Sequence, residues 1–274
     1  MNNLPKIDPR KESIRIIDFT KTTLRKQNFK NVVIGLSGGV DSALCFALLK
    51  ESIAPENIFV AHLYYFQPQI DALNPILQDT KIPPKNIYNI SIKSLVDEIA
   101  KTFNLAPLRA SFAEVATKAE QGFGGANRLR FGNIMARVRM ILLYDLAKKH
   151  NALVCGTENK SEFYLGYFTR FGDEASDFEP IRHLYKTQVY KLAEHAGIPK
   201  NIINQTPTAG LWEGQTDEGE FGFSYKEADQ VLYLYFEKSI PLPQIISKGF
   251  PNAEKIIERA KQNAFKHNLP YKVK

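Results

Sequence analysis

Cysteine is scarce in this sequence: Cys45 and Cys155 are the only two among 274 residues. Both have apolar neighbours, in the segments "ALCFALL" and "ALVCG". Cysteines in such surroundings are usually buried free thiols. Because two residues of this kind supply neither a disulfide framework nor a zinc site, the sequence predicts neither.

Long hydrophobic runs and blocks of like charge are also missing. No apolar stretch approaches the ~18 residues that span a bilayer, and the first segment, "MNNLPKIDPRKES", is polar. We therefore expect a cytoplasmic protein that is not bound to a membrane. The formal net charge is +7, yet no run of five like charges occurs. This favours a slightly basic surface over a nucleic-acid-binding site, and such a surface would suit a polyanionic substrate such as a nucleotide.

The chain does contain enough apolar material for a large core. Hydrophobic residues make up 44%, with 18 Phe and 12 Tyr, which argues against disorder. Strand-like segments alternate with helix-like segments, and this order predicts an α/β fold with a doubly wound, mainly parallel sheet and helices on both faces. We expect a single domain over residues 1–274. The predicted strands are 31–37, 57–66, 86–92 and 152–157, and the predicted helices are 42–51, 69–79, 93–103 and 127–150.

Other segments surround this repeating pattern. An opening helix is predicted whose apolar face includes Ile14, Ile17 and Leu24. Residues 105–125 carry mixed signals and neighbouring glycines, so we expect a mobile connection there. Between 165 and 223, glycine, proline and aspartate interrupt the pattern, and long irregular stretches of this kind are often functional. Two closing helices are predicted over 224–238 and 252–268.

The stretch "SGGVDS", residues 37–42, connects a predicted buried strand to a predicted helix. In such a turn, backbone N–H groups converge beside the positive end of the helix, an arrangement that binds phosphate. The lysine of a Walker A loop is missing, and Asp41 stands in the turn instead. Because an aspartate repels phosphate unless a divalent cation lies between them, Asp41 is predicted to bind magnesium. A plain helix N-cap with a glycine turn is the alternative.

The same stretch resembles the pyrophosphatase loop of enzymes that cleave ATP to AMP and pyrophosphate while adenylating a carbonyl oxygen. Four further segments resemble the ammonia-dependent NAD synthetase family in their order and approximate spacing: "GNIMARVRM", "GTENKSEFYLGYFTRFGD", "LYKTQVYKLAEHAGIP" and "PTAGLWEGQTDE". With the loop, they cover most of the chain from Val32 to about Tyr225. The resemblance implies an adenine nucleotide alpha hydrolase-like fold, a homodimer, and ATP as co-substrate with Mg²⁺.

The resemblance also implies roles for individual residues. Asp41 and Glu162 would hold magnesium, and Lys186 would neutralise charge on the phosphates as pyrophosphate leaves. Glu162 follows the strand at 152–157, at the edge where ligands collect in open α/β sheets. The implied ATP contacts are Gly35, Leu36, Ser37, Gly38, Gly39, Val40, Asp41, Ser42, Thr157, Lys186 and Thr208, and the implied substrate contacts are Arg137, Arg170, Asp177 and Lys266.

Several positions depart from the family's pattern. Phe131 stands where a lysine is expected, and Glu174 and Ala175 replace glycines. Arg182 and His183 stand where a small residue and a polar or acidic residue are usual. These changes concern the residues expected to bind the acceptor more than those expected to bind ATP. The sequence therefore indicates the adenylation reaction more strongly than the identity of the acceptor.

The implied reaction is the amidation of deamido-NAD to NAD in two steps. The nicotinate carboxylate attacks the α-phosphorus of ATP to give an acyl-adenylate, and ammonia then displaces AMP. Glutamine-using relatives carry an additional domain with a catalytic cysteine, and the 274 residues leave no room for it. Free ammonia is therefore the expected nitrogen donor, unless a separate subunit supplies it. Two alternatives stay open: a related enzyme with another acceptor, such as nicotinate mononucleotide or a tRNA base, or a non-catalytic nucleotide-binding protein.

Overall fold

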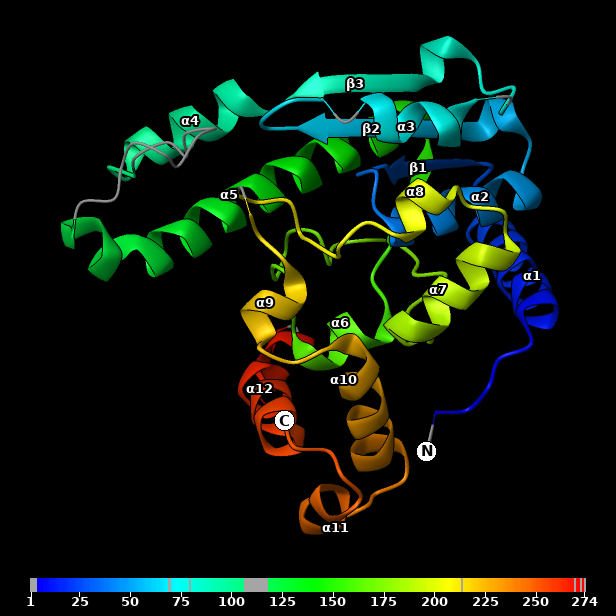
Figure 1. The fold of residues 1–274 in the computed structure, drawn as a ribbon. Helices are drawn as coiled ribbons and strands as arrows, with labels where there is room; N and C mark the ends of the chain where they lie inside the picture. The colour runs from blue at the N-terminus through cyan, green and yellow to red at the C-terminus, as the bar shows by residue number, and fades with distance from the viewer. Residues whose placement is uncertain are drawn as a thin grey trace.

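A four-stranded parallel sheet forms the centre of the computed structural model, which describes residues 4–68, 70–78, 80–105, 118–212, 214–268, 270–271 and 273 (Figure 1). The strand order is β3-β2-β1-β4. The chain runs outward from β1 to β3 and then returns to the other side of β1, so the predicted doubly wound parallel sheet is confirmed. The strands are β1 (Asn31–Gly35), β2 (Ile58–Tyr64), β3 (Ile87–Ser91) and β4 (Ala152–Cys155).

Helices cover both faces of this sheet. The side chains of β1 alternate between two cores: Val32 and Ile34 point toward one face and Val33 toward the other. Burial on both faces is typical of parallel strands and explains why β1 reads as an unbroken apolar run. One face is covered by α1 (Pro9–Gln27), α2 (Val40–Ser52), α3 (Ile70–Leu77) and α7 (Lys186–His195), and the other by α4 (Lys93–Thr102) and α5 (Lys118–His150).

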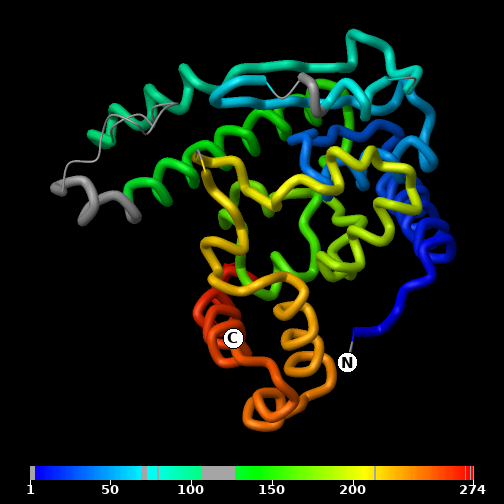
Figure 2. Tube along the Cα trace, viewed as in Figure 1, coloured from blue at the N-terminus to red at the C-terminus, as the bar shows by residue number. Residues whose placement is uncertain are grey.

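The C-terminal helices build a third core away from the sheet. Figure 2 shows them together at the end of the molecule opposite the strands. Leu165, Leu232 and Ile256 are among its fully buried side chains. The elements of this region are α6 (Lys160–Leu165), α9 (Asp217–Phe221), α10 (Tyr225–Leu232), η4 (Tyr233–Glu237), α11 (Leu242–Ser247), α12 (Ala253–Asn263) and η5 (Ala264–His267).

Two details of the sequence prediction need correction. In the opening helix, Ile14 is 52% exposed, and Ile16, Thr20 and Leu24 are buried in its place. Their regular spacing of four residues keeps one stripe of α1 against the sheet. The long helix α5 begins at Lys118 rather than near 127, so the end of the predicted mobile connection is helical. Residues 106–117 of that connection lie outside the described residues.

Short elements complete the chain. They are η1 (Pro55–Asn57), η2 (Pro84–Asn86) and α8 (Lys200–Ile203). Both cysteines are buried and free, as predicted. Across the described ranges, none of the helices combines the length and the apolar character that crossing a bilayer would require.

Candidate active site

The turn "SGGVDS" lies at the carboxyl end of β1, beside the end of its parallel neighbour β4. Ligands of open α/β sheets collect at such a point, where the chain switches direction across the sheet. Gly38 has a φ of 91°, which only glycine adopts without strain. The turn is closed by hydrogen bonds from Ser37 N to Ser42 Oγ (3.3 Å) and from Ser42 Oγ to Gly39 O (3.0 Å). The local sequence therefore dictates both the sharp turn and the start of α2.

A cavity of about 440 Å³ opens over this turn. It brings together nine of the predicted ATP contacts: Ser37, Gly38, Gly39, Val40, Asp41, Ser42, Thr157, Lys186 and Thr208. Glu162 lines it as well. The other two, Gly35 and Leu36, lie beneath the turn, where Leu36 is buried and its N–H donates to Ala61 O. The ATP-binding role of all these residues stays a prediction.

An ion cluster joins three elements at the floor of this cavity. Lys186 Nζ, at the start of α7, lies 2.5 Å from Asp41 Oδ2 of α2 and 3.3 Å from Glu162 Oε1 of α6. The Lys186 side chain is only 4% exposed, although a lysine at a helix start is usually on the surface. Asn159, which caps α6, donates from Nδ2 to Asp41 Oδ1 at 3.0 Å. Sequence reasoning did not single out Asn159, although its capping box with Glu162 is a recognisable signal.

The charges of this cluster depend on one another. Burial lowers the pKa of Lys186, but the carboxylates of Asp41 and Glu162 outweigh that effect and hold its pKa above the ordinary value. Lys186 is therefore a fixed cation. Burial raises the pKa of Glu162, and the charge of Lys186 opposes this rise. The two carboxylates converge on one positive charge, which is the arrangement a divalent cation also requires.

The donor set fits magnesium bound together with a phosphate. Magnesium usually takes one or two carboxylates and completes its shell with water and phosphate oxygens. Within the described part of the chain, no group of three or more His, Cys, Asp or Glu side chains is placed to hold a metal ion. Asp41 and Glu162 would therefore bind magnesium only with oxygens from a substrate.

Two further residues of the cavity were missed by sequence reasoning. Arg139 is half-buried, lines the cavity and donates from Nε to Leu63 O at 2.9 Å. Arg137, which was chosen instead from the same segment, is exposed and donates to Arg170 O at 3.1 Å. Asp217 is 3% exposed and accepts from Tyr225 Oη at 3.0 Å, while its Oδ1 has no hydrogen-bond partner. An unsatisfied carboxylate oxygen at a cavity wall is a candidate ligand contact.

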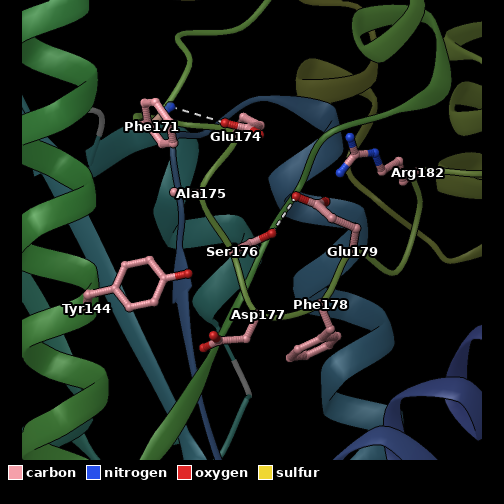
Figure 3. Close-up of a pocket in the computed structure, with 9 residues that line it drawn as sticks. All are labelled: Tyr144, Phe171, Glu174, Ala175, Ser176, Asp177, Phe178, Glu179 and Arg182. Carbon is pink, nitrogen blue, oxygen red and sulfur yellow. Dashed lines mark hydrogen bonds between the residues drawn. The ribbon is translucent and has the colours of Figure 1, made fainter. Parts of the chain in front are cut away.

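A second cavity, of about 380 Å³, holds most of the positions that depart from the family's pattern (Figure 3). Asp177, a predicted substrate contact, lines it and accepts from Val154 N at 2.7 Å. Glu174 accepts from Phe171 N at 3.1 Å, and Ser176 Oγ donates to Glu179 Oε1 at 2.7 Å. The complete lining is Tyr144, Phe171, Glu174, Ala175, Ser176, Asp177, Phe178, Glu179 and Arg182.

Acidic side chains form the boundary between the two cavities. Glu158 lines the first, Glu179 the second and Glu174 both. Glu158 N donates to Glu179 Oε2 at 3.1 Å, and Arg182 Nε lies 3.7 Å from Glu158 Oε2. Burial raises the pKa of Glu158 to about 9 and that of Glu179 to about 7, with Arg182 opposing both rises. The carboxyl of Glu158 is thus neutral at pH 7, and its two oxygens have no hydrogen-bond partner.

The remaining predicted residues lie outside the linings of these two cavities. Arg170 donates to Asn268 O at 3.4 Å, and Lys266 Nζ donates to Gly166 O and Phe168 O at 2.6 and 3.0 Å. Their substrate-binding roles stay predictions. Phe131 is 1% exposed and packs in the core, where its ring contacts Tyr65.

His183 lies outside the lining of the second cavity, and its Nε2 is 2.5 Å from Glu12 Oε1 of α1. Phe131 and His183 therefore have structural explanations. Of the departures, Glu174, Ala175 and Arg182 line the second cavity.

Comparison with known proteins gives consistent matches over the whole chain. Residues 12–270 match the family described as NAD synthase. The NH(3)-dependent NAD(+) synthetase of Fusobacterium nucleatum is 37% identical over 260 residues, which are 93% of this chain and 92% of the relative. The solved NMN synthetase from Francisella tularensis has a TM-score of 0.77 at 28% identity, covering 98% of this chain and 99% of that one. The NH3-dependent NAD synthetase from Campylobacter jejuni, solved with nitrate, has a TM-score of 0.74 at 29% identity, covering 98% and 100%.

Proposed function

The chain belongs to the NAD synthase family, and on that premise we propose that it is an ammonia-dependent ligase that converts deamido-NAD to NAD at the expense of ATP. One observation carries the proposal: Asp41, Glu162 and Lys186, from three separate helices, meet beside the phosphate-binding turn. Two carboxylates suit Mg²⁺ bound together with phosphate oxygens, and a buried cation suits the charge that develops when ATP is cleaved between its α- and β-phosphates. We also propose that residues 1–274 work as one ligase domain.

The residues of the first cavity would bind and polarise ATP. The N–H groups of the turn and the positive end of α2 receive the phosphates. The buried charge of Lys186 stabilises the negative charge that develops as pyrophosphate leaves, and a cation shielded from water acts strongly on such charge. Asp41 and Glu162 would hold Mg²⁺, which when bound neutralises phosphate charge. Attack by the acceptor's carboxylate gives the acyl-adenylate, which ammonia converts to the amide with release of AMP.

The acceptor would approach from the second cavity. Asp177 lies there, and the shared boundary of Glu158, Glu174 and Glu179 leads from it to the first cavity. The ammonia-dependent names of the relatives support free ammonia as the nitrogen donor. We further propose a cytoplasmic homodimer, for which the exposed apolar side chains Leu129 and Ile141 of α5 offer a surface. A monomer in sedimentation experiments at micromolar concentration would contradict the dimer.

Amidation of nicotinate mononucleotide is a second candidate function. Glu174 and Ala175, which replace glycines, line the acceptor cavity with Arg182. Glu174, Asp177 and Glu179 bring three carboxyl groups to this lining, and Arg182 brings one guanidinium. The phosphates of the two acceptors carry about the same negative charge near pH 7, but the side chains of Glu174 and Ala175 leave less room than glycines would, which favours the smaller mononucleotide. The similarity to the Francisella NMN synthetase agrees with this alternative.

Pyrophosphate release tested with different acids separates these functions. The purified protein is incubated with ATP, Mg²⁺, an ammonium salt and either deamido-NAD or nicotinate mononucleotide, and the amide product is quantified. We expect stoichiometric pyrophosphate, AMP and NAD, with the higher kcat/KM for deamido-NAD. A higher value for the mononucleotide would establish the second candidate. Pyrophosphate release with tRNA, but not with either of the two acids, would point to a tRNA-modifying enzyme. If no acceptor led to pyrophosphate release, the protein would be a non-catalytic nucleotide-binding protein.

A further inference from the structure

Asp229, on α10, is completely buried and lines neither of the two cavities. Its carboxylate nevertheless accepts three hydrogen bonds. Oδ1 accepts from Ser161 Oγ at 2.5 Å, and Oδ2 accepts from Thr187 N at 2.8 Å and from Thr187 Oγ1 at 2.7 Å. A buried carboxylate this well satisfied is held firmly in one position.

The donors belong to the first turns of the two helices that carry the ion cluster. Ser161 precedes Glu162 in α6, and Thr187 follows Lys186 in α7. Ser161 Oγ also accepts a hydrogen bond from Lys186 N at 2.8 Å. One carboxylate from the C-terminal core thus connects Thr187, the residue after Lys186, with Ser161, the residue before Glu162.

This arrangement does more than end a helix. A cap for α7 would need only the two bonds from Thr187, whereas the bond from Ser161 adds α6 to the same carboxylate. Burial raises the pKa of Asp229 to about 6, and the bonds from Ser161 and Thr187 oppose that rise. The partial positive charges at the two helix starts stabilise the anion as well. The consequence is a fixed geometry between α6 and α7.

We propose that Asp229 is a positioning residue for ATP cleavage, which holds the first turns of α6 and α7 together so that Glu162 and Lys186 face the phosphates in register. Asp229 acts through Ser161 and Thr187, without touching a substrate. The proposal rests on the proposed function, because it places the cleavage of ATP at the ion cluster. Its contribution falls on turnover more than on ground-state binding, since misplaced groups weaken the transition state most.

The test compares Asp229→Asn with a matched control on the same helix. The asparagine keeps the shape of the side chain but turns an amide NH2 toward one of the present donors. In the control, Glu227→Gln, the altered carboxylate also caps a helix, since Glu227 accepts from Asn252 N and Nδ2 at 2.9 and 2.7 Å. Glu227 serves the start of α12 and touches neither α6 nor α7 through these bonds.

Two measurements are made on each protein, together with its thermal unfolding midpoint. In pyrophosphate release, we expect Asp229→Asn to lower kcat at least about tenfold with a smaller rise in the KM for ATP, and Glu227→Gln to stay near wild type at a similar midpoint. The second measurement is calorimetric binding of ATP without acceptor, with and without Mg²⁺. The gain in affinity that Mg²⁺ produces should shrink in Asp229→Asn alone.

Each outcome decides the proposal. The proposal would be overturned if Asp229→Asn kept wild-type turnover and if Mg²⁺ increased its affinity for ATP as much as in wild type. Equal losses in Glu227→Gln would overturn it too, because they would reflect general loosening of α10. If wild-type protein releases no pyrophosphate with any acid, the proposed function fails, and the binding measurement still tests the positioning role. An increase in ATP affinity with Mg²⁺ that is lost only in Asp229→Asn supports this role. An increase that is unchanged in Asp229→Asn refutes it.

Discussion

Replacing Asp41 by asparagine tests the assigned metal and phosphate site most directly. The substitution keeps the size of the side chain and removes one negative charge. Asp41 now contacts Lys186 Nζ at 2.5 Å and Asn159 Nδ2 at 3.0 Å. In Asp41→Asn, Lys186 keeps Glu162 at 3.3 Å as its partner. The buried lysine is therefore not left unpaired, and we expect the free energy of unfolding to fall by only about 1–3 kcal/mol, less than the 3–5 kcal/mol of a fully broken buried pair.

Catalysis should suffer much more than stability. Loss of one preorganised group that stabilises transition-state charge costs roughly 10²–10³ in kcat, or about 2.7–4 kcal/mol. The assay is pyrophosphate release as a function of magnesium concentration. We expect Asp41→Asn to need far more magnesium and to remain slower than wild type at saturation, because Mg²⁺ would lose one of the two carboxylates proposed to hold it.

A matched control is available on α4. Asp97 Oδ2 also lies 2.5 Å from a lysine, Lys93 Nζ, and its side chain is 19% exposed against 16% for Asp41. Asp97 lines neither cavity, although it accepts from Tyr65 Oη of the first cavity's lining at 2.6 Å, and its lysine is 53% exposed against 4% for Lys186. Asp97→Asn therefore removes an ion pair of the same length in a more exposed place and should leave turnover near wild type. Wild-type turnover of Asp41→Asn at limiting magnesium would refute the assigned site. A comparable loss in Asp97→Asn would show that the effect is not specific to it.

Three further predictions concern the acceptor side and pH. Arg137→Ala should raise the KM for deamido-NAD at least about tenfold, or 1.4 kcal/mol, with much less change for ATP; equal losses for both would indicate a structural role. Arg182→Ala should raise the acceptor KM by about tenfold in the same assay, and an unchanged value would remove the second cavity from acceptor binding. Glu158 has its pKa raised by burial from the usual 4.5 to about 9, so between these values the native state keeps a proton that the unfolded state loses. The free energy of unfolding should therefore fall as pH rises through that window, by up to about 1.4 kcal/mol per pH unit. When it is measured by urea unfolding at several pH values, it should fall less steeply with pH in Glu158→Gln than in wild type. The same dependence on pH in both proteins would contradict the buried neutral carboxyl.

The sheet and the sharp turn at residues 37–42 could be predicted from the sequence because their signals are local. The apolar run of β1, two glycines and Asp41 at the start of α2 occupy adjacent positions, and the backbone of a turn depends mainly on its own residues. Strand and helix alternation then restricts the topology to very few arrangements. The parallel arrangement of the four strands follows from these rules, whereas their order, β3-β2-β1-β4, comes from the structure.

The rest of the site depends on contacts between residues far apart in the chain. Arg137 and Arg139 stand two positions apart in one segment, which is about 200° around a helix. The sequence offers no marker of which side faces the cavity, and the structure places Arg139 there. Asp229 reads as an ordinary polar residue of an amphipathic helix, and only tertiary packing places it against Ser161 and Thr187. Phe131 illustrates the opposite error, in which a core residue is taken for a binding residue. It departs from the family's pattern at a suspected binding position, yet its side chain is part of the core.

Lys186 lies where two of the three cores meet, and this position explains how a long, flexible side chain becomes a fixed charge. Tyr185, the residue before it, is buried in the C-terminal core, while Val189, one turn later, is buried against α1 and α2. The first turn of α7 is thus held from both sides, and Asp229 adds hydrogen bonds at the same place. Because each core is close-packed, a shift of either one moves Lys186 relative to Asp41 and Glu162. In the proposed function, the C-terminal helices therefore contribute to ATP cleavage through the position of Lys186, although the turn at residues 37–42 follows a strand of the sheet.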